Sequence, residues 1–224
     1  MNKDIQDRKN IVIAIDGPAA SGKGSLAKKL AEHFAYDFLD TGALYRRVAL
    51  KVINNNVDIT DKDAIIECAK ALAPEIILKY DDSALRNDKI GSIASIVAQI
   101  KEIRAILFDF QRNFALNATK GAVLDGRDIG TVIFPEADIK LFVTASLEKR
   151  AIRRQKELQS RGIDVMNAQV LAEMQERDDR DNVRLKDHLL PNHEVEIIDT
   201  SNMTPDEVID EALKIIEATL NPTS

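Results

Sequence analysis

Residues 11–25 read IVIAIDGPAASGKGS, an apolar run that passes directly into a glycine-containing loop. A continuous apolar run of this length is typical of a strand buried on both faces, which favours a parallel sheet. Residues 17–23 have the spacing G-x-x-x-x-G-K, and apolar residues then recur at helical intervals from Leu26 to Phe34. This order of strand, loop and helix predicts a phosphate-binding loop. Its backbone N–H groups, the helix N-terminus and Lys23 would hold the phosphates of a nucleoside triphosphate.

The loop departs from its commonest form, because Gly24 follows the lysine and a hydroxyl comes one place later, at Ser25. In this it resembles nucleoside monophosphate kinases more than GTPases or motor ATPases. Mg²⁺ often keeps several waters and leans on substrate phosphates. Ser25 is therefore a candidate metal ligand whose direct contact with the ion stays open, and Asp125, which ends the apolar run 122–124, is expected to reach the hydrated ion through water. A simple polar residue at a strand end is the alternative reading of Asp125.

The composition is that of an ordinary globular protein, with 224 residues, 45% of them hydrophobic and 30% charged. One domain with an insertion and two small domains both fit this length. The net charge of −6 argues against a protein that coats nucleic acid. Cys68 is the single cysteine, the first ten residues contain no apolar stretch, and no apolar run has the length of a membrane span. We therefore expect a cytoplasmic protein that binds neither nucleic acid nor membrane.

Strand and helix patterns alternate along the chain, which predicts the α/β class. Apolar runs predict the strands, and periodic apolar residues or start signals predict the helices. Strands are expected at residues 11–15, 38–40, 122–125, 139–143 and 194–198. Helices are expected at 43–53, 61–72, 91–118 with an internal break, 147–160 and 165–182, and after the start signal at 204–207. Residues 74–80 are expected to be extended and 81–89 to form a turn or hairpin tip.

Arginine is concentrated near the middle of the C-terminal half. Residues 146–186 hold seven Arg and three Lys against eight Asp and Glu. A solvated, salt-bridged helical face would account for this segment. The preference for Arg over Lys favours phosphate binding instead, because the planar guanidinium grips phosphate oxygens.

Three further stretches stand out: DTGALYR at 40–46, DGRDIGT at 125–131 and RDDRDNVR at 177–184. Together with the phosphate loop they resemble bacterial cytidylate kinases, and the likeness runs almost to the C-terminus. The resemblance implies a P-loop NTPase fold with a five-stranded parallel sheet flanked by helices. It implies one kinase domain, with a core at about 10–40, 119–145 and 193–222. A small monophosphate-binding excursion would span about 41–118 and an Arg-rich lid about 146–165.

The same resemblance implies a monomeric enzyme that transfers the γ-phosphoryl group of ATP to CMP or dCMP with Mg²⁺. The ATP site would comprise Gly17, Pro18, Ala19, Ala20, Ser21, Gly22, Lys23, Gly24, Ser25 and Arg153. The acceptor phosphate would be held by Arg46, Arg127 and Arg184. The cytosine would be surrounded by Thr41, Ser95, Arg104 and Asp128, and the ribose reached by Asp181 with Arg177. The catalytic cations would be Lys23, Arg127, Arg154 and Arg184, and the lid arginines Arg150, Arg153, Arg154 and Arg161.

The residue chemistry agrees with these roles, because phosphoryl transfer needs aligned cations and excluded water more than a covalent nucleophile. Arg177, Asp181 and Arg184 are spaced i, i+4 and i+7, so one helical face can present all three, and an exposed ion-pair ladder is the alternative. Lys23 is expected to face solvent as a ligand of phosphate. The segment 75–90 is shorter than the corresponding insertion in the bacterial cytidylate kinases that the chain resembles. This difference predicts a smaller monophosphate-binding excursion.

Other functions remain open at this point. A kinase for UMP, AMP or a non-nucleotide alcohol would share the phosphate loop, as would a nucleotide-gated switch. A GTPase switch should carry an N-K-x-D motif, and the sequence has none. The three histidines, His33, His188 and His193, show no metal-ligand spacing.

Overall fold

The computed structural model describes residues 10–72, 85, 87–185 and 194–221. Two compact units make up the chain. The first unit comprises residues 1–39 and 115–224, and the second comprises residues 40–114. The expected division into a core, a monophosphate-binding excursion and a lid stays a prediction.

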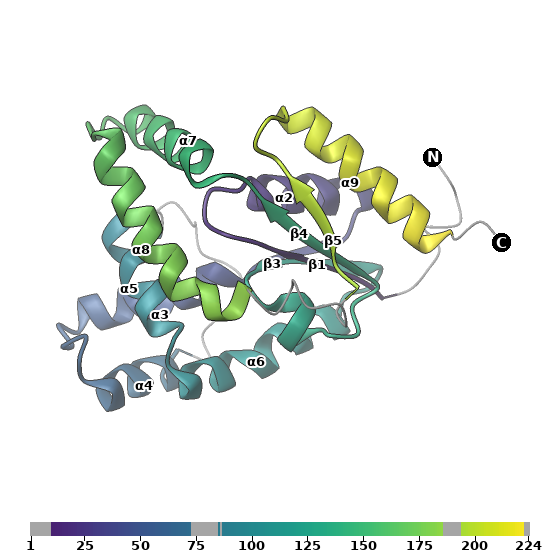
Figure 1. Cartoon of the computed structure of the whole chain (residues 1–224). Helices are drawn as coiled ribbons and strands as arrows, with labels where there is room; N and C mark the ends of the chain where they lie inside the picture. Colours follow the sequence, from purple (N-terminus) through teal and green to yellow (C-terminus); the bar gives the residue numbers. More distant parts are fainter. Residues whose placement is uncertain (1–9, 73–84, 86, 186–193, 222–224) are drawn as a thin grey trace. The chain divides into compact units, whose positions relative to one another are not determined.

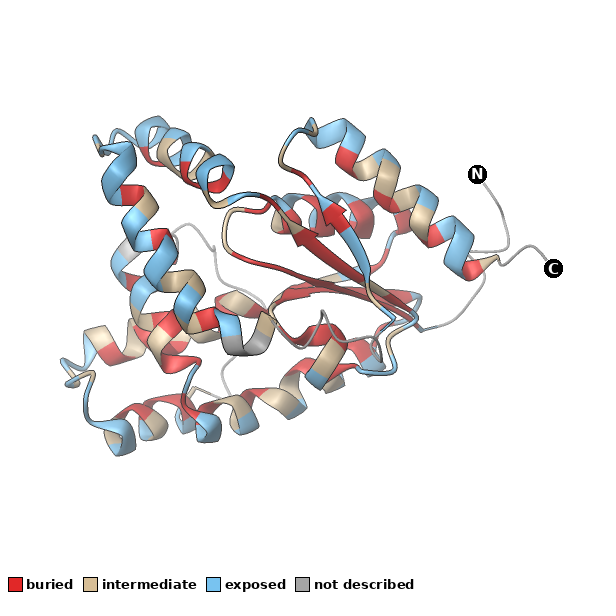
Figure 2. Cartoon of the chain, viewed as in Figure 1, coloured by how far each residue is buried: buried red, intermediate tan, exposed pale blue. Residues whose placement is uncertain are grey.

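The first unit contains a five-stranded sheet in the order β2-β3-β1-β4-β5 (Figure 1). The strands are β1 (Ile11–Asp16), β2 (Asp37–Asp40), β3 (Gly121–Gly126), β4 (Ile139–Thr144) and β5 (Glu196–Asp199). β1 pairs in parallel with β3 and β4, and β4 pairs in parallel with β5. Every residue of β1 and β3 is buried, as the apolar sequence of a central parallel strand requires (Figure 2). The five expected strands and the α/β class are confirmed.

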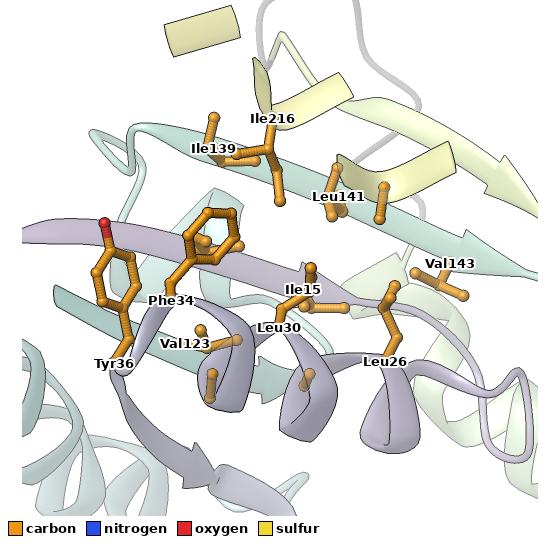
Figure 3. Packing of buried hydrophobic residues seen from close by; sticks show 14 of the residues in the cluster. Ile15, Leu26, Leu30, Phe34, Tyr36, Val123, Ile139, Leu141, Val143 and Ile216 are labelled. Atoms are coloured by element: carbon orange, nitrogen blue, oxygen red, sulfur yellow. The ribbon is translucent and has the colours of Figure 1, made fainter. Parts of the chain in front are cut away.

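Two helices pack their apolar faces on this sheet. In α2 (Lys23–Phe34), the buried residues Leu26, Leu30 and Phe34 recur at helical intervals. They meet Val123 and Ile139 of the strands in one hydrophobic cluster (Figure 3). α9 (Pro205–Leu220) contributes apolar residues to the same cluster and begins in a capping box formed by Thr204 and Glu207. The cluster therefore fixes α2, and with it the loop before α2, against the sheet.

Two further helices of the first unit form an antiparallel pair, α7 (Leu147–Ser160) and α8 (Asn167–Leu185) (Figure 1). A small cluster that includes Ala151, Leu158, Val170 and Met174 packs between them. The chain turns at Gly162, whose φ of +76° suits glycine. The expected helices at 147–160 and 165–182 are confirmed.

The second unit is helical. Its helices are α3 (Thr41–Asn54), α4 (Lys62–Lys70), α5 (Asp88–Val97) and α6 (Lys101–Leu116), the last of which ends just past the unit's border. The expected break in the 91–118 helix is confirmed, because α5 ends at Val97 and α6 begins at Lys101. Apolar residues from α3, α4, α5 and α6 contribute to the core, which includes Cys68, a free thiol at 5% exposure.

Two local expectations differ from the structure. Residues 88 and 89 fall in the stretch expected to form a turn, but they begin α5, because the Asn87 side chain accepts a hydrogen bond from the Lys89 N–H at 2.9 Å and so caps the helix. The segment after β3 also contains η1 (Ile129–Ile133), a single π-helical turn that the sequence pattern did not predict. Residues 74–80, most of 81–87 and therefore most of the shortened 75–90 stretch lie outside the described residues. Among the helices that are described, none combines the length and the apolar character needed to cross a bilayer.

Gly17 lets the loop after β1 pass close to the backbone of β4. A Cβ at this position would lie 2.0 Å from the Val143 carbonyl oxygen, and the φ of Gly17 is +148°. We therefore expect Gly17→Ala to lower the free energy of unfolding by more than about 3 kcal/mol, because backbone on both sides must shift. Urea unfolding followed by circular dichroism measures this.

Gly162→Ala is the matched control for Gly17→Ala. Gly162 also has a positive φ, but a Cβ there would meet nothing within 4 Å. Gly162→Ala should lower the free energy of unfolding by only about 1–2 kcal/mol, which is the backbone penalty alone. If both variants lose the same free energy of unfolding, the close approach of Gly17 to β4 adds nothing to the backbone penalty.

Candidate functional site

The carboxyl ends of β1 and β3 place two loops side by side. The two strands run parallel, with Ile15 opposite Asp125 and Asp16 opposite Gly126. The phosphate loop leaves one strand, and the segment containing Arg127 and Asp128 leaves its neighbour. In parallel α/β sheets, ligands bind at this edge.

The phosphate loop ends at Gly22, which has a φ of +96° and precedes α2 without capping it through a side chain. The first N–H groups of α2 therefore have no side-chain cap, which suits a bound anion. Lys23 Nζ lies 3.5 Å from the Pro18 carbonyl oxygen and 3.6 Å from Asp125 Oδ1. Lys23 is 8% exposed, so the expectation that it faces solvent is wrong, because the side chain folds over the loop toward a buried carboxylate.

Asp125 also accounts for the glycine that follows Lys23. A Cβ on Gly24 would lie 3.0 Å from Asp125 Oδ2, so a side chain there would crowd the carboxylate. Asp125 is 7% exposed, whereas Ser25 at the start of α2 is exposed. No group of three or more potential metal-binding side chains occurs in the described ranges.

Asp16, which the sequence patterns did not single out, joins the two loops. Its Oδ1 accepts a hydrogen bond from the Ile129 N–H at 2.9 Å, and its Oδ2 accepts one from the Gly130 N–H at 2.8 Å. Burial raises the pKa of Asp16 to about 7, against the effect of these two hydrogen bonds, and the nearby Asp128 and Asp125 raise it further. The signal in the sequence was an acidic residue that directly ends a wholly apolar strand.

Arg127 makes an ion pair with Asp181 of α8. Arg127 Nε lies 2.9 Å from Asp181 Oδ2, and Nη1 donates to the Gly126 carbonyl at 3.0 Å. Burial lowers the pKa of Arg127, but the carboxylates, Asp181 first, outweigh it and raise the pKa above its usual value. Asp181 is 2% exposed, which excludes the exposed ion-pair ladder as an account of this residue. Arg177 lies one turn earlier in α8, and the side chain of Arg184 lies outside the described part of the chain.

Arg150 ties α7 to both the phosphate loop and α8. Its two terminal nitrogens lie 2.5 and 3.0 Å from the carboxylate oxygens of Asp178. Arg150 also donates to the backbone carbonyls of Ala145 at 2.9 Å and Ala19 at 3.3 Å. At 5% exposure, it is held within the protein, and the sequence patterns gave no role to its partner Asp178.

The other three expected lid arginines, two in α7 and one directly after it, have different neighbours. Arg153 donates to the side chain and the carbonyl of Thr200, at 2.9 and 2.5 Å. Arg154 and Arg161 both pair with Glu157 near the far end of α7. Whether Arg153 and Arg154 also contact ATP stays a prediction.

In the second unit, the expected acceptor residues lie on three helices. Arg46 Nη2 lies 2.7 Å from Asp40 Oδ2, and Asp40 Oδ1 caps α3 by accepting the Ala43 N–H at 3.1 Å. A Cβ on Gly42 would lie 3.0 Å from Arg46 Nη1, so glycine gives the guanidinium room to reach Asp40. The remaining expected residues are Thr41 and Ser95, both buried, and the half-buried Arg104.

A family model described as cytidylate kinase matches residues 13–218 of the chain. A cytidylate kinase from Paramagnetospirillum magneticum is 49% identical over 92% of this chain and 97% of its own length. One from Rhodospirillum rubrum is 47% identical over 92% and 97%. Among solved structures, an uncharacterized protein from Eubacterium ventriosum superposes with a TM-score of 0.57 at 17% identity, covering 94% of this chain and 99% of its own. That likeness concerns the fold alone, whereas the family model and the close relatives show that this chain belongs to the cytidylate kinase family.

Proposed function

We propose that this chain transfers the γ-phosphoryl group of ATP to CMP or dCMP, giving ADP and CDP or dCDP. Family membership supports the reaction. The observation that carries the site is the parallel register of β1 and β3, which sets the phosphate loop beside the segment with Arg127 and Asp128. One loop would bind the donor and the other would bind the acceptor. We further propose a monomer in the cytoplasm, where the single buried Cys68 would stay reduced.

The donor would be bound by the loop backbone at 17–25 and by Lys23. The α2 N-terminus carries partial positive charge, and the ammonium of Lys23 would move from Asp125 toward the transferring phosphates. Arg153 and Arg154 of α7 would complete the donor side when the lid closes. Because charge spreads over the equatorial oxygens during transfer, these cations, once in place, would stabilise the transition state more than the ground state.

The acceptor would be held by cations that the protein already orients with carboxylates. Arg46 is set by Asp40 and Arg127 by Asp181, so little side-chain freedom remains to be lost on binding phosphate. Arg184 would join them. Thr41, Ser95, Arg104 and Asp128 would surround the cytosine, and Asp181 with Arg177 would reach the ribose.

Mg²⁺ fits the hard oxygen ligands at the carboxyl edge. Asp125 and Ser25 would hold it with the nucleotide phosphates, Asp125 acting through water. When bound, the ion would neutralise charge on the phosphates. The buried Asp125 carboxylate beside Lys23 is the observation that supports this placement.

A panel of acceptors tests the function directly. Purified protein is given ATP and Mg²⁺, and ADP release is followed with CMP, dCMP, UMP, AMP or no acceptor. CMP and dCMP should give the highest kcat/KM. Equal or faster transfer to UMP or AMP would identify a different monophosphate kinase. Nucleotide binding with no transfer to any acceptor would identify a switch.

Lys23→Ala should lower kcat for CMP phosphorylation by roughly 100-fold or more, because one preorganised cation at the transferring phosphate is lost. The matched control is Lys29→Ala, an exposed lysine on the same helix, which should leave kcat within about twofold. Lys23 is buried beside Asp125, so thermal unfolding of both variants must be compared first. A folded Lys23→Ala variant with near-normal turnover would remove Lys23 from the donor site.

Asp128→Asn should narrow the preference for CMP over UMP by about tenfold in kcat/KM. Cytosine presents an exocyclic amino donor where uracil has a carbonyl oxygen. A carboxylate accepts from the first and repels the second, whereas an amide can also donate to uracil. Kinetics with both acceptors measure the ratio for wild type and variant.

Asp138→Asn is the control for Asp128→Asn. Asp138 accepts a hydrogen bond from the Val12 N–H at 2.9 Å and directly precedes β4. It therefore lies at the amino ends of the strands, whereas the two loops follow the carboxyl ends. It should leave the CMP to UMP ratio unchanged. If Asp128→Asn also leaves the ratio unchanged, Asp128 does not read the base and its role is structural.

A further inference from the structure

Thr200 is a wholly buried polar residue that directly follows β5, the last strand. It is 1% exposed, and its N–H donates to the Thr144 carbonyl of β4 at 2.8 Å. It lies in none of the stretches that identify the family. Its side chain nonetheless reaches the phosphate loop, which is 179 residues away in sequence.

The Thr200 hydroxyl joins three elements of the first unit. Its Oγ1 lies 2.8 Å from the Ser21 carbonyl oxygen, 3.0 Å from the Thr144 carbonyl oxygen and 2.9 Å from Arg153 Nη1. A hydroxyl has one proton to donate and can accept at its lone pairs. Because Arg153 can only donate, the hydroxyl accepts from Arg153 and gives its proton to a carbonyl, with Ser21 at the shorter distance.

Arg153 reinforces this arrangement from α7. Its second terminal nitrogen donates to the Thr200 carbonyl at 2.5 Å, and Nη1 also lies 3.4 Å from the Ser21 carbonyl oxygen. Both of its contacts to Thr200 are charge-assisted hydrogen bonds, which are stronger than neutral ones. The guanidinium therefore occupies an acceptor site of the Thr200 hydroxyl and leaves its proton for a carbonyl, of which that of Ser21 is the nearer.

Holding the Ser21 carbonyl also orients the next backbone N–H. The peptide unit is planar and trans, so the Ser21 carbonyl and the Gly22 N–H point in opposite directions. Gly22 is exposed and has a φ of +96°, a conformation that glycine leaves easily without such a contact. The hydrogen bond from Thr200 therefore turns the Gly22 N–H away from the buried side, directly before Lys23 and the start of α2.

We propose that Thr200 is a positioning residue for the donor phosphates, acting through the Ser21–Gly22 peptide and linking α7 to the phosphate loop through Arg153. This inference rests on the proposed function, because it takes the loop to be the ATP site. A purely structural role at the end of β5 would make a different prediction. It would lower stability when the hydroxyl is removed and leave the affinity of the folded protein for ATP unchanged.

The test compares Thr200→Val, which removes the hydroxyl and keeps the shape, with Thr200→Ser, which keeps the hydroxyl. Thr200→Val should raise both the KM and the dissociation constant for ATP by about tenfold, since the Ser21 carbonyl loses its shortest hydrogen bond and Arg153 Nη1 loses the hydroxyl that accepts from it. The KM for CMP should stay within about twofold. Thr200→Ser should restore ATP affinity to within about threefold of wild type.

Thr219→Val is the matched control, since Thr219 donates to the Ile215 carbonyl within α9 at 2.9 Å on the protein surface. It should change neither constant. If Thr200→Val does not fold, Thr200→Cys takes its place, and its weak S–H donor should raise the ATP dissociation constant severalfold. Normal ATP affinity in a folded Thr200→Val or Thr200→Cys variant overturns the proposal, as does an equal rise in the KM for CMP.

The ATP dissociation constant is measured directly by calorimetry, without turnover. If wild type binds ATP but phosphorylates no monophosphate, the proposed reaction fails, while the comparison of ATP affinities still decides the role of Thr200.

Discussion

The carboxylate of Asp16 is the contact on which the rest of the site depends. It accepts one N–H from Ile129 and one from Gly130, and so binds the end of β1 to the turn that follows β3. Two neighbouring N–H groups in a buried segment need acceptors, and losing both would be costly. Because this turn follows Arg127 and Asp128 directly, Asp16 sets where these two residues lie relative to the phosphate loop. The π-helical turn η1 begins at this contact, because Ile129 and Gly130 are its first two residues.

Opposite charges lie close together in the candidate site. Asp125, Asp128 and Asp181 are buried, and Lys23 and Arg127 lie among these carboxylates. Burial first, and then the nearby Asp128 and Asp125, raise the pKa of Asp16, whereas a neighbouring cation lowers the cost of burying a carboxylate. The 3.6 Å between Lys23 Nζ and Asp125 Oδ1 exceeds an ordinary hydrogen-bond distance, so this contact is an ion pair without a short hydrogen bond. Under the proposed function, the Lys23 ammonium would exchange this carboxylate for a phosphate of ATP.

The sequence predicted the strands, most helices and the phosphate loop, because periodicity and the G-x-x-x-x-G-K spacing are local signals. It did not predict that Lys23 is buried, that Asp16 bridges two loops, or that Arg150 binds Asp178 and the backbone of Ala19. Each of these contacts joins residues that are far apart in the chain, and only folding of the sheet brings them together. The start of α5 was missed for a local reason, because the Asn87 cap lies in a polar stretch that also suits a turn. The role of the loop and of Lys23 toward ATP follows from the spacing at 17–23, whereas the roles of the arginines and of the residues around CMP were taken from family resemblance, and all of them remain predictions.

The single cysteine gives this protein a built-in reporter of local opening. Cys68 lies in the core of the second unit, with its thiol 3.8 Å from the Asn55 side-chain amide, and no other residue of the chain carries a thiol. A buried thiol reacts only when the structure around it opens, so its rate of modification measures the free energy of that opening. The opening of the second unit can therefore be measured from the rate of Cys68 modification in the wild-type protein. This measurement is independent of the sheet that carries the phosphate loop.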